Sequence, residues 1–312
     1  MPKVRRRATS LAISELIVII FTSSKPYSLV DSACASQKDK PVTEKYDVLP
    51  TQSVELLKEL HILTRDGKLN QDSRRKLKQV FHLVQFIEPL MRECLEKGHM
   101  TLVDHGAGKS YLGFLLNDLF CKLQKNPSQI IGIDSRSDLV KKSQDLAQKL
   151  NFKNMVFIDC LSSEAQKHPA IPQEVDIVTA LHACNTASDD AIRFGLEKKA
   201  KFMVLVPCCQ AEVAAALRQT KGHQLKNELS EIWRRPLHTR EFGSHITNVL
   251  RCLQLESHGY EVTVTELIGW EHSMKNELII ASYRGSSGTS AARRKDRILE
   301  EIGLTALAAR FA

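Results

Sequence analysis

The chain has 312 residues, of which 43% are hydrophobic and 26% charged. This is an ordinary globular composition and it excludes a wholly disordered protein. The formal net charge of +8 favours polyanionic partners, of which RNA is the commonest. The eight cysteines follow no regular spacing. We therefore interpret them as reduced core thiols of an intracellular protein rather than as a structural zinc site.

Residues 1–40 differ in texture from the rest of the chain. Basic residues precede an apolar run at 11–21, which Glu15 interrupts, and a small-residue stretch follows at 33–35. A signal peptide, an organelle presequence and a spurious upstream start all remain open. The run is too short to span a bilayer comfortably, so no membrane partner is expected. We expect a cytoplasmic protein, or a protein of an organelle matrix if residues 1–40 are a transit peptide.

The next segment, residues 41–98, has a helical pattern. Leucines recur at helix spacing over 56–63, and a second apolar run covers 77–87. Gly98 is expected to end the second helix. We therefore predict a helical N-terminal extension over 41–98.

From residue 99 to residue 285, short apolar runs alternate with amphipathic stretches. The expected strands are 101–104, 130–134, 155–159, 175–181, 202–206, 261–267 and 278–283. The alternation predicts an α/β fold: a doubly wound, mostly parallel, seven-stranded, Rossmann-like sheet that ends in an antiparallel hairpin. Residues 286–312 are expected to form a linker and a short, loose, basic tail helix.

The strongest local motif is an apolar strand that runs into the turn Asp104-His105-Gly106-Ala107-Gly108 and then into a helix. Gly106 permits a tight turn, and Gly108 lets the backbone approach a ligand closely. A phosphate-binding loop would need a glycine at Val103, and a dinucleotide site would need one at Tyr111. The turn is therefore expected to bind S-adenosylmethionine, with Asp104 near the positively charged methionine moiety.

Two further strands end in acidic residues. Asp134, followed by Ser135, is expected at the ribose hydroxyls, and Asp159, followed by Cys160, is expected at the adenine amino group. Each carboxylate alone also fits a helix cap or a turn. Because three of them follow successive strands behind a Gly-x-Gly turn, we favour a cofactor site that Leu181, at the end of the fourth strand, also lines.

Three segments carry a family resemblance: Asp104-His105-Gly106-Ala107-Gly108-Lys109-Ser110-Tyr111-Leu112, the run Ala180-Leu181-His182-Ala183-Cys184-Asn185-Thr186-Ala187-Ser188-Asp189-Asp190, and Val206-Pro207-Cys208-Cys209-Gln210. Over residues 70–285 the chain resembles the methyltransferase-domain family shared by glutathione S-transferase C-terminal domain-containing proteins and their bacterial relatives. The resemblance implies a class I fold and methyl transfer from S-adenosylmethionine. Family members often carry Gly-Cys-Gly-Lys-Gly in the turn, where this chain has Ala107 and Ser110.

The candidate catalytic residues are His182, Cys184 and Cys208. His182 suits a general base, although a histidine that is merely hydrogen-bonded at a strand end fits equally well. The two cysteines follow the fourth and fifth strands, where RNA cytosine-5 methyltransferases keep a thiol pair, but they also fit inert core positions. No metal is expected, because the adjacent Cys208 and Cys209 chelate poorly. Asp189 and Asp190 are expected to cap the following helix rather than to take part in the chemistry.

Basic residues mark the expected acceptor side, and the candidate substrate-binding residues are Arg74, Arg75, Lys78 and Arg240. They suit phosphate contacts, although ordinary solvated charges remain an alternative. The sequence thus predicts a methyltransferase acting on RNA (tRNA or rRNA) or on protein. The alternative is an inactive methyltransferase-like scaffold that binds RNA or a protein partner, since the Asn/Asp-Pro-Pro-aromatic signature of amino methylation is absent.

Overall fold

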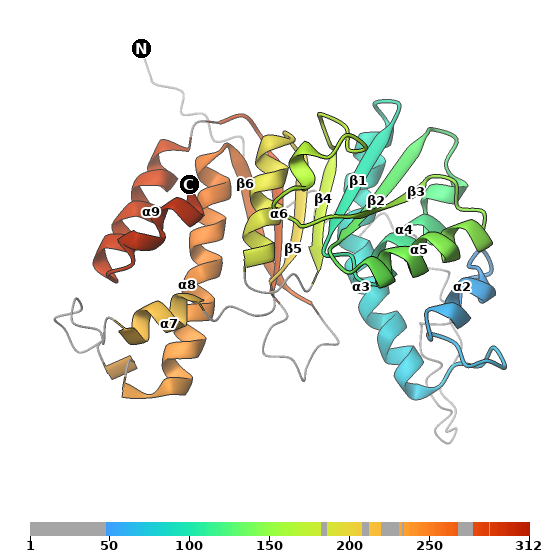
Figure 1. The fold of residues 1–312 in the computed structure, drawn as a ribbon, viewed down its shortest axis with the longest axis horizontal. Helices are drawn as coiled ribbons and strands as arrows, with labels where there is room; N and C mark the ends of the chain where they lie inside the picture. The colour runs from blue at the N-terminus through green and yellow to red at the C-terminus, as the bar shows by residue number, and fades with distance from the viewer. Residues whose placement is uncertain are drawn as a thin grey trace, which may run out of the picture. The chain divides into compact units, whose positions relative to one another are not determined.

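The computed structural model describes residues 48–181, 186–207, 212–219, 231–232, 234–267, 277–286 and 288–312 (Figure 1). Its strands are β1 Met100–His105, β2 Ser128–Asp134, β3 Met155–Asp159, β4 Ile177–Leu181, β5 Phe202–Val206, β6 Tyr260–Glu266 and β7 Glu277–Tyr283. The α-helices are α2 Val54–Glu59, α3 Gln71–Leu95, α4 Tyr111–Leu119, α5 Ser137–Lys149, α6 Thr186–Glu197, α7 Glu212–Gln219, α8 Pro236–Ser257 and α9 Thr289–Glu301. Within these residues, none of the helices has the length and apolarity needed to span a membrane.

The strands form one seven-stranded sheet in the order β3-β2-β1-β4-β5-β7-β6. The neighbours from β3 to β5 are parallel, whereas β7 is antiparallel to both β5 and β6. The predicted doubly wound sheet and its antiparallel ending are confirmed. The chain winds outward from β1 to β3 and then returns to place β4 beside β1. This reversal is the topological switch point, where open α/β sheets bind their ligands beyond the carboxyl ends of the strands.

Each face of the sheet is buried by a separate set of helices. Leu102, Ile130 and Phe157 share a core with α3, α4 and α5. The alternate residues Val103 and Ile131 pack on the other side with α6. Period-two alternation of the strand side chains explains this division. It also means that residues two apart on a strand face the same set of helices.

The helical segment before β1 shares the core of the sheet. Leu56 and Leu57 of α2 are fully buried in the same cluster as Leu102. The start of α2 is held by Asp118 of α4, whose carboxylate oxygens accept hydrogen bonds from the Ser53 N–H at 3.0 and 3.2 Å. Gly98, with a φ of +109°, follows the end of α3 as expected. Residues 48–98 are therefore packed against the sheet.

The tail after β7 is also packed, and the expectation of a loose helix is wrong. Phe311 is fully buried and clusters with Leu299 of α9 and with Leu250 of α8. The tail reaches α8 by a close backbone approach, because a Cβ at Gly288 would lie 2.1 Å from the carbonyl oxygen of Glu256. Burial of its apolar residues explains why a segment rich in arginine is held in place.

Candidate cofactor site

Three predicted carboxylates lie at the same edge of the sheet and on the same face. Asp104 pairs with Gly132 across β1 and β2, and Asp134, two residues further on, pairs with Asp159 of β3. Residues in register, or two apart, point to the same face of a sheet. The strand ends therefore bring the three carboxyl groups to one side of the carboxyl edge, next to the glycine turn.

Asp104 is buried beside the switch point. Its side chain is 3% exposed, and its Oδ1 accepts a hydrogen bond of 2.7 Å from the Oγ1 of Thr179 on β4. Burial, with a smaller contribution from the neighbouring Asp134, raises the pKa of Asp104 to about 7, against the lowering effect of the Thr179 hydroxyl. A buried carboxylate is stabilised by a nearby cation. Asp104 thus suits the positively charged part of a ligand.

The glycine turn has the left-handed backbone that its sequence predicts. Gly106 and Gly108 have φ values of +66° and +59°. The Ala107 N–H donates to the Ile133 carbonyl at 2.9 Å, which joins the turn to β2. A Cβ on Gly108 would lie 3.3 Å from the Nη2 of Arg136. Both glycines are therefore needed for the conformation and for the close approach of side chains to the backbone.

Asp134 connects the turn to the second strand. Its Oδ2 accepts the Gly108 N–H at 2.8 Å, and its two oxygens accept the Nε and Nη2 of Arg136 at 2.9 and 3.0 Å. Burial would raise the pKa of Asp134, but the hydrogen bonds from Arg136 and Gly108 outweigh it and lower that pKa. Asp134 is thus an ionised acceptor beside the turn. The following Ser135 is exposed.

The remaining predicted cofactor residues line the same edge. Asp159 is exposed at the end of β3, and the half-buried Cys160 donates its N–H to the Asp134 carbonyl at 3.3 Å. Burial raises the pKa of the Cys160 thiol. Leu181 is half-buried at the end of β4, on the face shared with Thr179. All eight predicted cofactor residues lie in the turn or at a strand end.

Two residues near this site were missed by sequence reasoning. Thr179 carries a signal, because it is the one polar residue in the strand Ile177–Leu181. Arg136 lies two residues after Asp134, and its own N–H donates to Asp134 Oδ1 at 2.9 Å. An aspartate that accepts the N–H two residues on is a common turn. The contact of the Arg136 guanidinium with Asp134 could not be predicted from the sequence.

Ser110 takes the place of the last glycine in the related turn and keeps a glycine-like backbone, with a φ of +50°. It is fully buried, and its hydroxyl has no hydrogen-bond partner in the part of the chain that the structure describes. A non-glycine residue in this region is strained by its Cβ. The serine is therefore tolerated at a cost in stability.

The candidate catalytic residues His182, Cys184 and Cys208 lie outside the described residues. The expectation that Asp189 caps the next helix is wrong. The helix α6 begins at Thr186, so Asp189 lies inside its first turns, where it is 2% exposed and accepts a hydrogen bond of 2.6 Å from the Nε of Arg251. A cap must precede the first helical residue.

The predicted substrate-binding residues lie on two helices. Arg74 and Arg75 are exposed near the start of α3, with Lys78 half-buried behind them. Arg240 is exposed in the first turns of α8 and contacts Glu241 at 2.7 Å.

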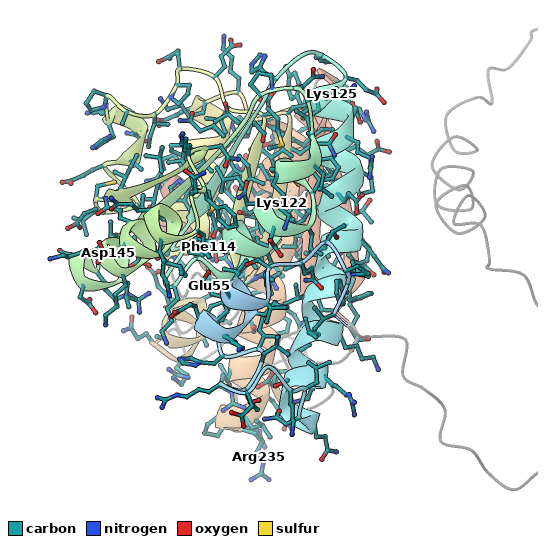
Figure 2. The ribbon with its side chains drawn as sticks, turned by 90° about the vertical axis from the view of Figure 1, so that its right-hand side faces the viewer. Glu55, Phe114, Lys122, Lys125, Asp145 and Arg235 are labelled. Carbon is teal, nitrogen blue, oxygen red and sulfur yellow. The ribbon has the colours of Figure 1, made fainter. Side chains whose placement is uncertain are left out.

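In Figure 1 the starts of α3 and α8 both extend beyond the carboxyl ends of the parallel strands. Arg235, at the N-cap of α8, lies at the opposite end of the view in Figure 2 from Lys125, which precedes β2. The basic groups thus lie at the same end of the sheet as the cofactor residues.

No group of three or more histidine, cysteine or acidic side chains that could hold a metal ion occurs among the residues described here.

Comparison with known proteins places this fold among methyltransferases. Residues 75–216 match the family described as Methyltransferase domain. No curated protein matches the sequence.

Several solved structures are similar to part of the chain. An rRNA methylase from Streptococcus thermophilus has 9% identity and a TM-score of 0.41, covering 64% of this chain and 95% of that one. Aeropyrum pernix fibrillarin, with natively bound S-adenosyl-L-methionine, has 13% identity and a TM-score of 0.36, covering 58% and 66%. Precorrin-6y C5,15-methyltransferase from Geobacter metallireducens has 16% identity and a TM-score of 0.37, covering 64% and 88%. Likeness at this level transfers no substrate to the chain.

The sheet order, the glycine turn and the family match together define a class I S-adenosylmethionine-dependent methyltransferase. Its cofactor is S-adenosylmethionine. The buried acidic group at β1 and the ionised acceptor at β2 fit a ligand that combines a cationic centre with a ribose.

Proposed function

We propose that the chain transfers the methyl group of S-adenosylmethionine to RNA, and that the cofactor lies along the carboxyl ends of β1, β2 and β3. The observation that carries the cofactor assignment is the common face of Asp104, Asp134 and Asp159 beside the left-handed glycine turn. The bound cofactor supplies an electrophilic methyl group on its sulfonium. The residues of the chain orient it.

Each carboxylate has a distinct part in this proposal. Asp104, buried and held by Thr179, faces the cationic methionine moiety. Asp134 accepts hydrogen bonds from the ribose hydroxyls, for which it must share its oxygens with Arg136. Asp159, with the Cys160 N–H nearby, lies at the adenine. The roles of His182 as a base and of Cys184 and Cys208 as nucleophile and partner stay predictions.

RNA is favoured as the acceptor by the charge at the carboxyl edge. Arg74 and Arg75 on α3, and Arg235 and Arg240 on α8, are exposed at that end of the sheet. Arginine side chains around a site pair with phosphates and give binding that depends on salt. A protein acceptor would have less use for cations at this end of the sheet.

The test has two stages on the full chain. Calorimetric titration with S-adenosylmethionine measures cofactor binding, and tritium transfer to total RNA and total protein measures turnover. We expect label in RNA that RNase removes. Label in protein alone would mean that the acceptor is a protein and not RNA. Cofactor binding without transfer to RNA or to protein would favour the inactive scaffold.

A matched pair of variants tests the basic surface. The double variant Arg74→Gln/Arg75→Gln should lower transfer to RNA and weaken its dependence on salt, because phosphate contacts are lost. The control Arg293→Gln/Arg297→Gln removes two exposed arginines of α9, and transfer should persist. An equal loss of transfer to RNA in both double variants would show that only the net charge of the chain matters.

A further inference from the structure

A cluster of four charged side chains, three of them largely buried, joins the tail to the starts of two helices. We name it the Arg310 clamp: Asp189 of α6, Glu212 of α7, Arg251 of α8 and Arg310 of the 3-10 helix Thr305–Phe311. One oxygen of Asp189 accepts Arg251 Nε at 2.6 Å, and the other accepts Arg310 Nε at 2.8 Å. Arg310 also pairs with Glu212. The side chains of Asp189, Arg251 and Arg310 are 2%, 1% and 14% exposed, whereas that of Glu212 is 47% exposed.

The charges of the clamp balance. Two guanidiniums meet two carboxylates, and each buried charge has a partner of opposite sign. Burying ions is costly unless they are paired and hydrogen-bonded, and removing one partner leaves the others uncompensated. The arrangement is therefore cooperative and holds four chain segments in one geometry.

The place of the clamp in the sheet topology points to its use. The chain leaves β4 after Leu181 and enters α6 at Thr186, and it leaves β5 after Val206 and enters α7 at Glu212. Both exits are at the carboxyl edge, because β4 and β5 are parallel to β1. The clamp binds the first residue of α7 and the fourth residue of α6, immediately after both connections.

A third connection at this edge reaches the same cluster. The strand β7 begins at Glu277, whose Oε2 accepts a hydrogen bond of 2.7 Å from the Nδ2 of Asn248. The Oδ1 of Asn248 in turn accepts Arg251 Nη1 at 3.3 Å. The elements that come next in the chain after β4, β5 and β6 thus each carry, within their first four residues, a residue tied directly or through Asn248 to Arg251 or Arg310.

Contacts on either side of Arg310 hold the tail, and with it the Arg310 side chain, in place. Phe311 is fully buried, its carbonyl accepts a hydrogen bond from the Nζ of Lys295, and Gln254 donates to the Ala312 carbonyl at 2.9 Å. These contacts tie the tail to α8 and α9. Arg310 is therefore part of a preformed scaffold and reaches α6 and α7 from it.

From this geometry we infer that Arg310 is a positioning residue for methyl transfer. By fixing the starts of α6 and α7 it holds in place the helices that follow the carboxyl ends of β4 and β5, on the acceptor side of the site. The inference rests on the proposed function, since it assigns that side of the sheet to the acceptor. It makes residues 305–311 part of the active unit, although the family match ends at residue 216.

The test compares three full-length variants with the wild type. Arg310→Gln removes the charge, and Arg310→Lys keeps the charge but lacks the fork that reaches both carboxylates. The control Arg294→Gln breaks an exposed pair of the same tail with Glu256, at 2.7 Å, without touching α6 or α7. The measurements are calorimetric titration with S-adenosylmethionine, tritium transfer to total RNA, and hydrogen exchange of residues 186–192 and 212–219.

For Arg310→Gln we expect transfer to fall by about tenfold to a hundredfold, as a small misplacement of a reactive geometry does. Cofactor affinity should change by less than about twofold, because the cofactor residues lie on other elements. Amide exchange in the two segments should become faster, Arg310→Lys should be intermediate, and Arg294→Gln should match the wild type.

The inference is overturned if transfer by Arg310→Gln equals that of the wild type, if cofactor affinity and transfer fall in parallel, or if exchange does not change. If the wild type labels neither RNA nor protein, the proposed function fails and hydrogen exchange alone decides: faster exchange in both segments supports the clamp, and unchanged exchange overturns it.

Discussion

The two halves of the sheet are built in different ways. In the half formed by β1, β2 and β3, the site comes from short stretches of chain: the turn at 104–110 and the strand ends at 134–136 and 159–160. In the half formed by β4 to β7, the buried charges come from residues 189, 251 and 310, which are far apart in sequence. The first half is a local motif, and the second depends on long-range packing. The cofactor half should therefore respond to changes in ligand contacts, and the acceptor half to changes in stability and positioning.

The largest effect should come from Arg251→Met, which removes a fully buried cation from the acceptor half. Breaking a buried ion pair costs about 3–5 kcal/mol, because the remaining charge loses its partner. Chemical denaturation at pH 7 measures the free energy of unfolding. The control Arg284→Met removes an exposed pair with Glu261, at 3.0 Å, and should cost less than about 1 kcal/mol. Equal losses in the two variants would mean that the clamp is no more than surface charge.

The next effect should come from Asp134→Ala in the cofactor half. Loss of hydrogen bonds to a charged group costs about 1.5–3 kcal/mol, so affinity for S-adenosylmethionine should fall by about tenfold to a hundredfold. Titration calorimetry measures it. Asp138→Ala is the matched control, since Asp138 is exposed in the first turn of α5, just after the site, and its carboxylate lies 3.6 Å from the Nζ of Lys142. Unchanged affinity in Asp134→Ala would remove this residue from the ribose site.

Asp104 should make both the stability of the chain and its affinity for S-adenosylmethionine depend on pH. Its folded pKa of about 7 lies above the ordinary value of 3.8, so the folded chain keeps a proton there that the unfolded chain loses. Stability should therefore fall as pH rises from about 4 to about 7. A cationic ligand favours the ionised form, so affinity for S-adenosylmethionine should fall by up to about tenfold for each pH unit below 7.

Titrations at pH 6 and pH 8 measure this dependence, with Asp104→Asn as the variant that should lose it. The asparagine keeps an oxygen for the Thr179 hydroxyl. If the variant shows the same pH dependence as the wild type, another group is responsible for it.

The smallest effect should come from Ser110→Gly, which should raise the free energy of unfolding by about 1 kcal/mol. Glycine removes the strain of the left-handed backbone, and it removes a buried hydroxyl that lacks a partner. Ser137→Gly, at the start of α5, should lower stability slightly instead, because glycine disfavours a helix. Thermal unfolding of both variants measures the difference. A loss of stability in Ser110→Gly would indicate that the hydroxyl has a role in the turn.

The same division explains what could be predicted from the sequence. Apolar alternation located the seven strands, and glycine chemistry located the turn, because both depend on neighbouring residues. The grouping of Asp104, Asp134 and Asp159 in one site followed from their places at the ends of successive strands. These predictions depend only on local rules.

The misses have a common physical cause. Asp189 was expected to be a cap because its partners, Arg251 and Arg310, lie 62 and 121 residues away along the chain. The tail was expected to be loose because it is short and basic and follows a stretch rich in serine and glycine, and nothing local shows that Phe311 is buried. Of the missed residues, only Thr179 could have been recognised from the sequence, because it is a polar residue in an apolar strand.

The close backbone approach at Gly288 limits which residues this position can accept. Any Cβ there would meet the backbone of Glu256 at 2.1 Å and of Ser257 at 2.4 Å, where no rotamer change can relieve the overlap. In a library that samples every amino acid at each position, residue 288 should tolerate almost nothing, while the exposed Thr289 and Ser290 beside it accept most replacements. One hydrogen atom in place of a methyl group thus determines how the last two dozen residues are routed across α8.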